Sequence, residues 1–150
     1  MTVEYNEGAE VGYRWFAQRS AQPLYPFGHG LSYTSFDYAD FKVTGGDTIS
    51  ATFTVINTGE RDGATTPQLY LNAIAGQPRK RLLGFERVEL PRGESRNVSM
   101  TADPRLLARF DCDSGQWCID DGSCTVVLGA DANDVMFESI VRLSGRSFGR

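Results

Sequence analysis

Over most of the chain, short runs of β-branched and aromatic residues alternate with clusters of turn residues. In the clearest run, Ile49, Ala51, Phe53 and Val55 alternate with residues that mostly carry hydroxyl groups. A period of two is typical of a strand that buries one face. Repeated at this spacing, the pattern predicts an all-β antiparallel sandwich of about seven strands. The predicted strands are 36–43, 49–56, 68–73, 82–90, 95–101, 124–129 and 135–143.

Three local signals refine this prediction. The apolar phase slips at Ala39-Asp40, as a β-bulge requires. The segment 57–63 contains glycines and Asx side chains that reverse the chain. Asp103 followed by Pro104 predicts one capped helical turn, because an Asp side chain accepts orphan backbone N–H groups and proline suits the first helical position.

The segment 117–119 is predicted to form one arm of a hairpin. Asp121-Gly122 supplies a short turn signal, and 124–129 would form the second arm. In this assignment the segment 117–119 pairs with the strand 124–129 that follows it in sequence.

The three cysteines, Cys112, Cys118 and Cys124, repeat every six residues. On a hairpin, Cys112 can face Cys118, or Cys118 can face Cys124, at the separation that a disulfide needs. Either pairing leaves one thiol over. The sequence therefore allows one disulfide, which would suit an oxidising compartment, or three free thiols.

The N-terminal segment differs from the rest, because glycines and prolines interrupt every period while aromatic residues accumulate. Its aromatic residues are Tyr5, Tyr13, Trp15, Phe16, Tyr25, Phe27 and Tyr33. Disordered segments are normally poor in such residues. We therefore divide the chain into a leader, residues 1–34, and a sandwich, residues 35–150. The leader should pack either on the sandwich itself or on another domain that this chain lacks.

Charge and composition exclude some classes of function. The chain has 41% hydrophobic residues and a formal net charge of −4, which gives no general attraction to nucleic acid or anionic lipid. No apolar run is long enough to span a membrane, and no signal peptide is visible. The basic triplet Arg79-Lys80-Arg81 is interpreted as a solvated loop, with an anion or partner contact as the alternative.

Three stretches carry a more specific signal. They are EGAEVGYRWF at 7–16, PLYPFGHGLSYT at 23–34, and a set of short matches between 55 and 88 that comprises VINTG, QLY and LGFERV. Together they resemble the carboxyl-terminal part of family 3 glycoside hydrolases, the β-glucosidase and β-xylosidase family. The resemblance covers nearly the whole chain in the order and spacing of that family.

The resemblance implies an immunoglobulin-like or fibronectin type III-like sandwich that follows a barrel domain and an α/β domain. The catalytic carboxylates of that family would lie upstream of Met1, so no catalytic residue is assigned to this chain. It would then be a non-catalytic, stabilising module of an enzyme that hydrolyses O-glycosyl bonds. A periplasmic or secreted location is favoured for that parent enzyme.

We expect the contact with the upstream barrel and α/β domains to be made by the leader. The residues assigned to this contact are Tyr13, Arg14, Trp15, Tyr25, Phe27 and His29. The alternative function is a free-standing carbohydrate-binding or adhesion sandwich, in which leader aromatics make weak contacts with an oligosaccharide. Titration with oligosaccharides would separate the two hypotheses.

No cofactor or metal is predicted. His29 is the single histidine, which is too few for a multi-histidine zinc site, and its ring is expected to be held beneath a tight loop. The paired aspartates fall in predicted turns, where Asp bonds its own backbone. Asp131 and Asp134 could offer oxygens to calcium, but the surrounding loop lacks the distal glutamate of an EF-hand.

Overall fold

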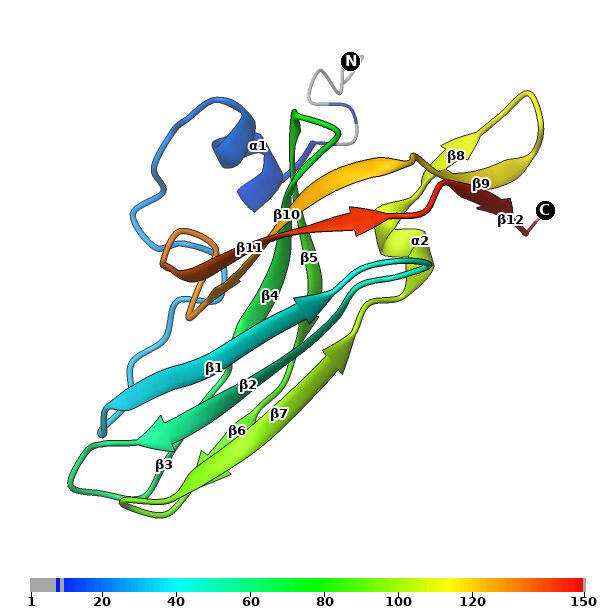
Figure 1. Ribbon diagram of the computed structural model, residues 1–150. Coiled ribbons are helices and arrows are strands. Elements are labelled where there is room, and N and C mark those ends of the chain that lie inside the picture. The colour runs from blue at the N-terminus through cyan, green and yellow to red at the C-terminus, as the bar shows by residue number, and fades with distance from the viewer. Residues whose placement is uncertain (1–7, 9, 150) are drawn as a thin grey trace.

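The computed structural model describes residues 8 and 10–149, and it shows two large antiparallel sheets packed face to face (Figure 1). The first sheet has the order β1-β2-β7, and the second has the order β11-β10-β4-β5. The strands of the first sheet are β1 (Phe36–Thr44), β2 (Ser50–Asn57) and β7 (Ser95–Thr101). Those of the second are β4 (Gln68–Ile74), β5 (Gln77–Phe85), β10 (Gly122–Gly129) and β11 (Val135–Leu143). The predicted all-β sandwich is confirmed.

Two small sheets and two short helices complete the described part of the chain. Strands β3 (Gly63–Thr65) and β6 (Val88–Leu90) pair with each other. A second small sheet has the order β12-β9-β8, formed by β12 (Arg146–Phe148), β9 (Gln116–Ile119) and β8 (Arg109–Asp111). The helices are α1 (Tyr13–Gln18) and α2 (Pro104–Leu107). Neither is long and apolar enough to cross a bilayer.

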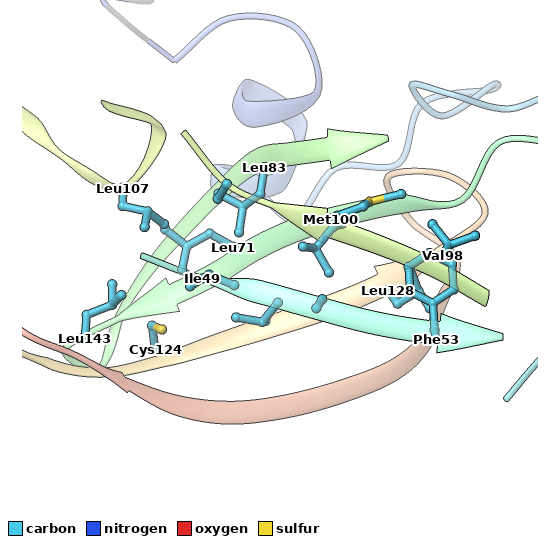
Figure 2. Close-up of a cluster of buried hydrophobic side chains, with 14 of the residues drawn as sticks. Ile49, Phe53, Leu71, Leu83, Val98, Met100, Leu107, Cys124, Leu128 and Leu143 are labelled. Carbon is cyan, nitrogen blue, oxygen red and sulfur yellow. The ribbon is translucent and has the colours of Figure 1, made fainter. Parts of the chain in front are cut away.

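The hydrophobic core lies between the two large sheets (Figure 2). Strand β2 alternates as its sequence predicts: Ile49, just before it, and Ala51, Phe53 and Val55 within it are at most 1% exposed. Leu71 and Leu128 from the opposite sheet complete the same cluster. Burial of apolar area of this extent is the main stabilising contribution to such a domain.

The local signals in β1 and α2 are also confirmed. The register of β1 against β2 shifts between Ala39 and Lys42, and Asp40 has a φ of 54°, in the left-handed region. Asp103 caps α2, where its carboxylate accepts a hydrogen bond from the Arg105 backbone N–H at 2.9 Å. Both features follow from the local chemistry of the chain.

The predicted strand 82–90 is wrong, because the chain changes sheet in its middle. Strand β5 ends at Phe85, and β6 begins at Val88 and pairs with β3. The two halves have opposite apolar phases, since Leu83 is buried in one half and Val88 and Leu90 in the other. A single straight strand could not bury all three side chains on one face.

The predicted hairpin of 117–119 with 124–129 is also wrong. Strand β9 pairs with β8 and β12, whereas β10 pairs with β4 and β11. The Asp121-Gly122 signal marks a change of direction between two sheets. A turn signal of this kind specifies where the chain bends and leaves the identity of the neighbouring strand to tertiary packing.

The triplet Arg79-Lys80-Arg81 lies within β5, so its assignment to a solvated loop is wrong. Arg81 donates to the carbonyl of Leu106 at 2.9 Å, and Arg79 donates to that of Ala108 at 3.0 Å. These carbonyls lie at the end of α2, where backbone acceptors lack helical partners. The charged ends therefore cap α2 while the stems follow the edge strand.

Candidate docking surface of the leader

The leader lies against the outer face of the β11-β10-β4-β5 sheet, and Tyr13 of α1 is its inner anchor (Figure 1). The Tyr13 ring lies 5.8 Å from the Tyr70 ring and 5.1 Å from the Phe27 ring. Its hydroxyl oxygen accepts a hydrogen bond from the Leu82 backbone N–H at 2.9 Å. Of the residues assigned to an interdomain contact, Tyr13 thus faces the sandwich of its own chain.

A buried polar pair lies against the loop that follows α1, whose Phe27 carbonyl accepts a hydrogen bond from the Ala132 N–H at 2.9 Å. The Gln68 amide nitrogen donates to the Ala130 carbonyl at 2.9 Å, and the Tyr70 hydroxyl donates to the Gln68 Oε1 at 2.5 Å. Gly28 lies directly on this amide with a φ of +88°, and a Cβ there would approach the Gln68 Nε2 to 1.9 Å. Only glycine fits such a close approach in this backbone conformation.

Asn57 holds the other end of the leader. Its Oδ1 accepts hydrogen bonds from the Thr34 hydroxyl at 2.8 Å and from the Gly59 N–H at 3.1 Å. Its Nδ2 donates to the carbonyls of Arg61 at 2.8 Å and Leu90 at 3.0 Å. A single fully buried amide therefore joins the leader, the turn after β2 and β6.

His29 lies between these anchors on the leader loop. Its Nδ1 is 3.6 Å from Asp131 Oδ2, and its ring is 5.6 Å from the Tyr25 ring. Asp131 also accepts hydrogen bonds from the N–H groups of Asn133 and Asp134 at 2.8 and 2.9 Å. This aspartate therefore organises the turn between β10 and β11, the role that its position in the sequence indicates.

The opposite side of the leader is apolar and uncovered by any other described residue. Leu31 and Tyr33 are each 95% exposed, and Leu24, Tyr25 and Phe27 are more than half exposed. We call these five residues the outer leader surface. Beside it, Phe27, Leu82 and Phe85 line a hollow of about 250 Å³. Several exposed large apolar side chains on one anchored segment indicate an interaction site in soluble proteins.

Helix α1 adds a second apolar area. Val11, Gly12, Trp15 and Phe16 line a hollow of about 280 Å³. The rings of Trp15 and Phe16 lie 5.1 Å apart, edge to face, and the Arg19 guanidinium lies 4.7 Å from the centre of the Trp15 ring. These side chains are held by one another more than by the sandwich.

The structure divides the six leader residues assigned to a contact. Tyr25 and Phe27 lie on the outer leader surface, Trp15 lies on α1, and Arg14 forms an ion pair with Glu10. Tyr33 was counted among the leader aromatics but not assigned to the contact, and Leu24 and Leu31 were missed by sequence reasoning. Their segment has no hydrophobic period, so the sequence offers no sign that tells an exposed leucine from a buried one.

All three cysteines are free thiols, which is one of the two alternatives that the sequence left open. In the small sheet, Cys118 lies opposite Arg109 and Ser147 instead of Cys112. Cys124 lies in the core, where burial raises the pKa of its thiol. Neither pairing that the sequence allowed is formed: the register of β8 against β9 places Arg109 opposite Cys118, and Cys118 and Cys124 lie in strands of different sheets.

Several acidic groups of the described residues stabilise turns or form surface ion pairs. Asp111 accepts a hydrogen bond from the Ser114 hydroxyl at 2.5 Å, which lowers the pKa of Asp111, and Asp121 pairs with Arg142 at 2.5 Å. Within residues 8 and 10–149, no three His, Cys, Asp or Glu side chains converge as a metal site would require.

Comparison with known proteins identifies the relatives of this chain. Residues 65–132 match the family model of the fibronectin type III-like domain. The chain is 36% identical over 150 residues to thermostable β-glucosidase B of Acetivibrio thermocellus, a match that covers 95% of this chain and 20% of the relative. It is 40% identical over 146 residues to probable β-glucosidase K of Emericella nidulans, covering 94% and 17% respectively.

Solved structures give the same result. A GH3 β-glucosidase of Bifidobacterium adolescentis matches with a TM-score of 0.85 and 35% identity, over 93% of this chain and 21% of the other. β-Glucosidase 3B of Thermotoga neapolitana matches with a TM-score of 0.87 and 33% identity, over 97% and 21%. The chain spans about a fifth of the length of the relatives that it matches.

Proposed function

The chain is a fibronectin type III-like module related to the β-glucosidases of glycoside hydrolase family 3, and we propose that it stabilises such an enzyme by docking on its catalytic body. The observation that carries this proposal is the outer leader surface. Leu31 and Tyr33 are almost fully exposed although they follow a loop that is bound to the sandwich, where the Ala132 N–H donates to the Phe27 carbonyl at 2.9 Å. An anchored apolar surface favours a protein partner over a flexible tail.

In this proposal, residues 1–34 form the docking segment and residues 35–150 the sandwich that supports it. The partner is a barrel domain with an α/β domain, which carry the catalytic carboxylates and hydrolyse a β-glucoside. Two facts support this arrangement: the leader aligns with enzymes about five times longer, and its inward side packs on the sandwich while apolar side chains on its outward side stay exposed. The module itself supplies a complementary apolar surface for this contact.

A chimera tests the proposal. The segment of the Acetivibrio thermocellus β-glucosidase that aligns with this chain is replaced by this chain, and hydrolysis of an aryl β-glucoside is measured before and after heating. We expect an active chimera and an inactive isolated chain. In the chimera, Leu31→Ser with Tyr33→Ser should lower the free energy of unfolding by about 3 kcal/mol, because two docked apolar side chains are lost.

The matched control is Phe110→Ser, which removes an exposed apolar ring from β8, outside the leader. This variant should leave the heat resistance of the chimera nearly unchanged. In the isolated chain, the Leu31 and Tyr33 changes should cost under about 0.5 kcal/mol. Equal losses in the chimera and the isolated chain would contradict docking, since both side chains would then act within the sandwich.

Carbohydrate binding is the second candidate function, and a different surface favours it. Phe110, Trp117 and Phe148 lie opposite one another in the β8-β9-β12 sheet, with Phe110 and Trp117 rings 5.3 Å apart. Phe110 is exposed while Trp117 and Phe148 pack partly against the core, and aromatic rings in such a row can stack on sugar rings. Titration of the isolated chain with gluco- and xylo-oligosaccharides should then give saturable Trp117 fluorescence changes that Trp117→Phe abolishes, while Trp15→Phe retains them.

A further inference from the structure

A cavity of about 510 Å³ separates α1 from the edge strand β5. Its charged lining consists of Glu10 and Arg14 from the leader and Arg79 and Lys80 from β5, joined by the polar side chain of Asn72. The volume exceeds that of a few water molecules and suits a small solute. Neither the apolar docking surface nor the aromatic row uses this space.

The charges around the cavity do not balance. Three cations face one carboxylate, and that carboxylate is already engaged, because Glu10 accepts hydrogen bonds from Arg14 Nε at 2.8 Å and from Arg14 Nη2 at 2.6 Å. Arg79 and Lys80 therefore have no carboxylate of their own in the lining, although Asp120 acts on Arg79 and Asp131 acts on Lys80 from outside it. This excess is notable on a chain whose net charge is −4.

The two cations of β5 are also partly removed from water. Burial lowers the pKa of the Arg79 guanidinium, and the nearby charge of Arg14 lowers it further, while Asp120 and Glu10 offset part of the effect. Burial likewise lowers the pKa of Lys80, although Asp131 offsets part of the effect. Arg79 and Arg14 repel each other, and a cation that has lost hydration gains from an anion placed beside it.

Unused donors remain in the cavity. Within the described residues, Arg79 donates a side-chain hydrogen bond to the Ala108 carbonyl, and Lys80 donates one to the Ala132 carbonyl. A guanidinium carries five N–H donors and an ammonium carries three, so both groups have donors left for a ligand. Arg14 presents its own guanidinium on the other wall.

We propose that the cavity between α1 and β5 binds a small, doubly charged oxyanion of the phosphate class. Arg79 and Lys80 would hold the ligand from β5, and Arg14 would approach it from the leader. A bound oxyanion would thus link the leader to the edge strand and stabilise the packing of α1 against β5. Docking on a catalytic body is not required for this binding.

Chemical-shift titration of the isolated, isotope-labelled chain with inorganic phosphate tests the site, at neutral pH and constant ionic strength set with chloride. We expect saturable shifts confined to α1 and the start of β5, with a Kd of about 1 mM. Arg79→Gln should weaken binding about tenfold through loss of a charge-assisted contact. Glu10→Gln should strengthen it severalfold, because Arg14 is released from its carboxylate.

The opposite signs of these two effects separate an anion site from a structural role, since both variants remove a charged group from the same cavity. Arg14→Gln is a second weakening variant that leaves the cap of α2 untouched. The control is Arg92→Gln, which breaks a surface pair with Glu60 at 2.9 Å. Shifts that do not saturate, equal binding of neutral glucose, or equal loss of affinity in the Arg92 variant would each overturn the proposal.

Discussion

Asn57 shows how much of the fold depends on a single side chain. It is fully buried, and its amide makes four hydrogen bonds to three separate parts of the chain. Buried donors and acceptors that lose their partners cost about 1–3 kcal/mol each. The side chain at this position therefore connects the leader to the sandwich as well as closing a turn.

Replacement of this amide gives the first stability prediction. Asn57→Ala should lower the free energy of unfolding by about 3 kcal/mol, because it leaves buried carbonyls and the Thr34 hydroxyl without partners. Urea denaturation measures the loss. Asn97→Ala is the matched control, since Asn97 is exposed on β7 and should change stability by under about 0.5 kcal/mol. Similar losses at the two positions would contradict the role given to Asn57.

Tyr70 makes stability depend on alkaline pH. Burial raises the pKa of its hydroxyl above the ordinary 10.0, and the neighbouring Tyr13 raises it further. The folded state therefore holds this proton more tightly than the unfolded state. The resulting stability is fully present below pH 10.0 and is lost as the pH rises above that value.

Tyr70→Phe tests this dependence in denaturant titrations at several alkaline pH values. The variant should be less stable at neutral pH by about 1–3 kcal/mol, because Gln68 Oε1 loses its donor. Its stability should then fall less steeply above pH 10.0 than that of the parent chain. The lowered pKa of Lys80 acts in the opposite sense, and is the same in both proteins. If the stability of the two proteins fell in parallel above pH 10.0, the assignment of this pH dependence to Tyr70 would be contradicted.

At the scale of elements, the two large sheets and the small ones differ in how their strands are specified. Strand β2 buries alternate side chains, so its place and its inward face were predictable from its period of two. Strands β3, β8 and β12 have three residues each, too few for a period, and were not predicted. Their pairing depends on distant partners that no local pattern indicates.

Strand β5 shows a second limit of sequence reasoning. Its basic triplet has the composition of a solvated loop, yet the guanidinium groups of Arg79 and Arg81 bond the end of α2. Charged side chains with long apolar stems can occupy a half-buried edge strand when their ends reach backbone carbonyls. Those carbonyls come from a helix more than twenty residues away in sequence, so only the fold reveals them.

A pair of phenylalanines tests the assignment of core and surface in these elements. Phe53→Ala on β2 should lower the free energy of unfolding by about 4 kcal/mol, because its ring fills the centre of the core. Phe85→Ala at the end of β5 should cost under about 1 kcal/mol, because that ring is 64% exposed. Chemical denaturation of the two variants measures both. A loss at Phe85 equal to that at Phe53 would show that the hollow beside Phe27 is filled.

At the scale of the whole molecule, the leader belongs to the sandwich on one side and faces outward on the other. Tyr13, Gly28 and Thr34 hold its inner side along the length of the fold. The density of aromatic residues indicated that the leader needs a covering surface, and left open whether the sandwich supplies it. The structure shows that the sandwich covers Tyr13 and leaves Leu31 and Tyr33 exposed.

This division explains how one small domain could stabilise a much larger enzyme. The inner anchors fix the backbone of the leader before docking, so little conformational entropy remains to be lost on association. The exposed side chains then contribute apolar area to the contact. Weakening an inner anchor should therefore reduce docking as well as folding, whereas changes on the outer leader surface should reduce docking alone.

Hydroxyl-radical footprinting of the isolated chain and of the chimera with the Acetivibrio thermocellus enzyme tests the docking of the leader most directly. We predict that oxidation of Leu24, Tyr25, Leu31 and Tyr33 falls severalfold in the chimera, while that of Phe110 stays the same. Equal oxidation of these four side chains in both proteins would contradict the account, because the outer leader surface would remain in water beside the catalytic body.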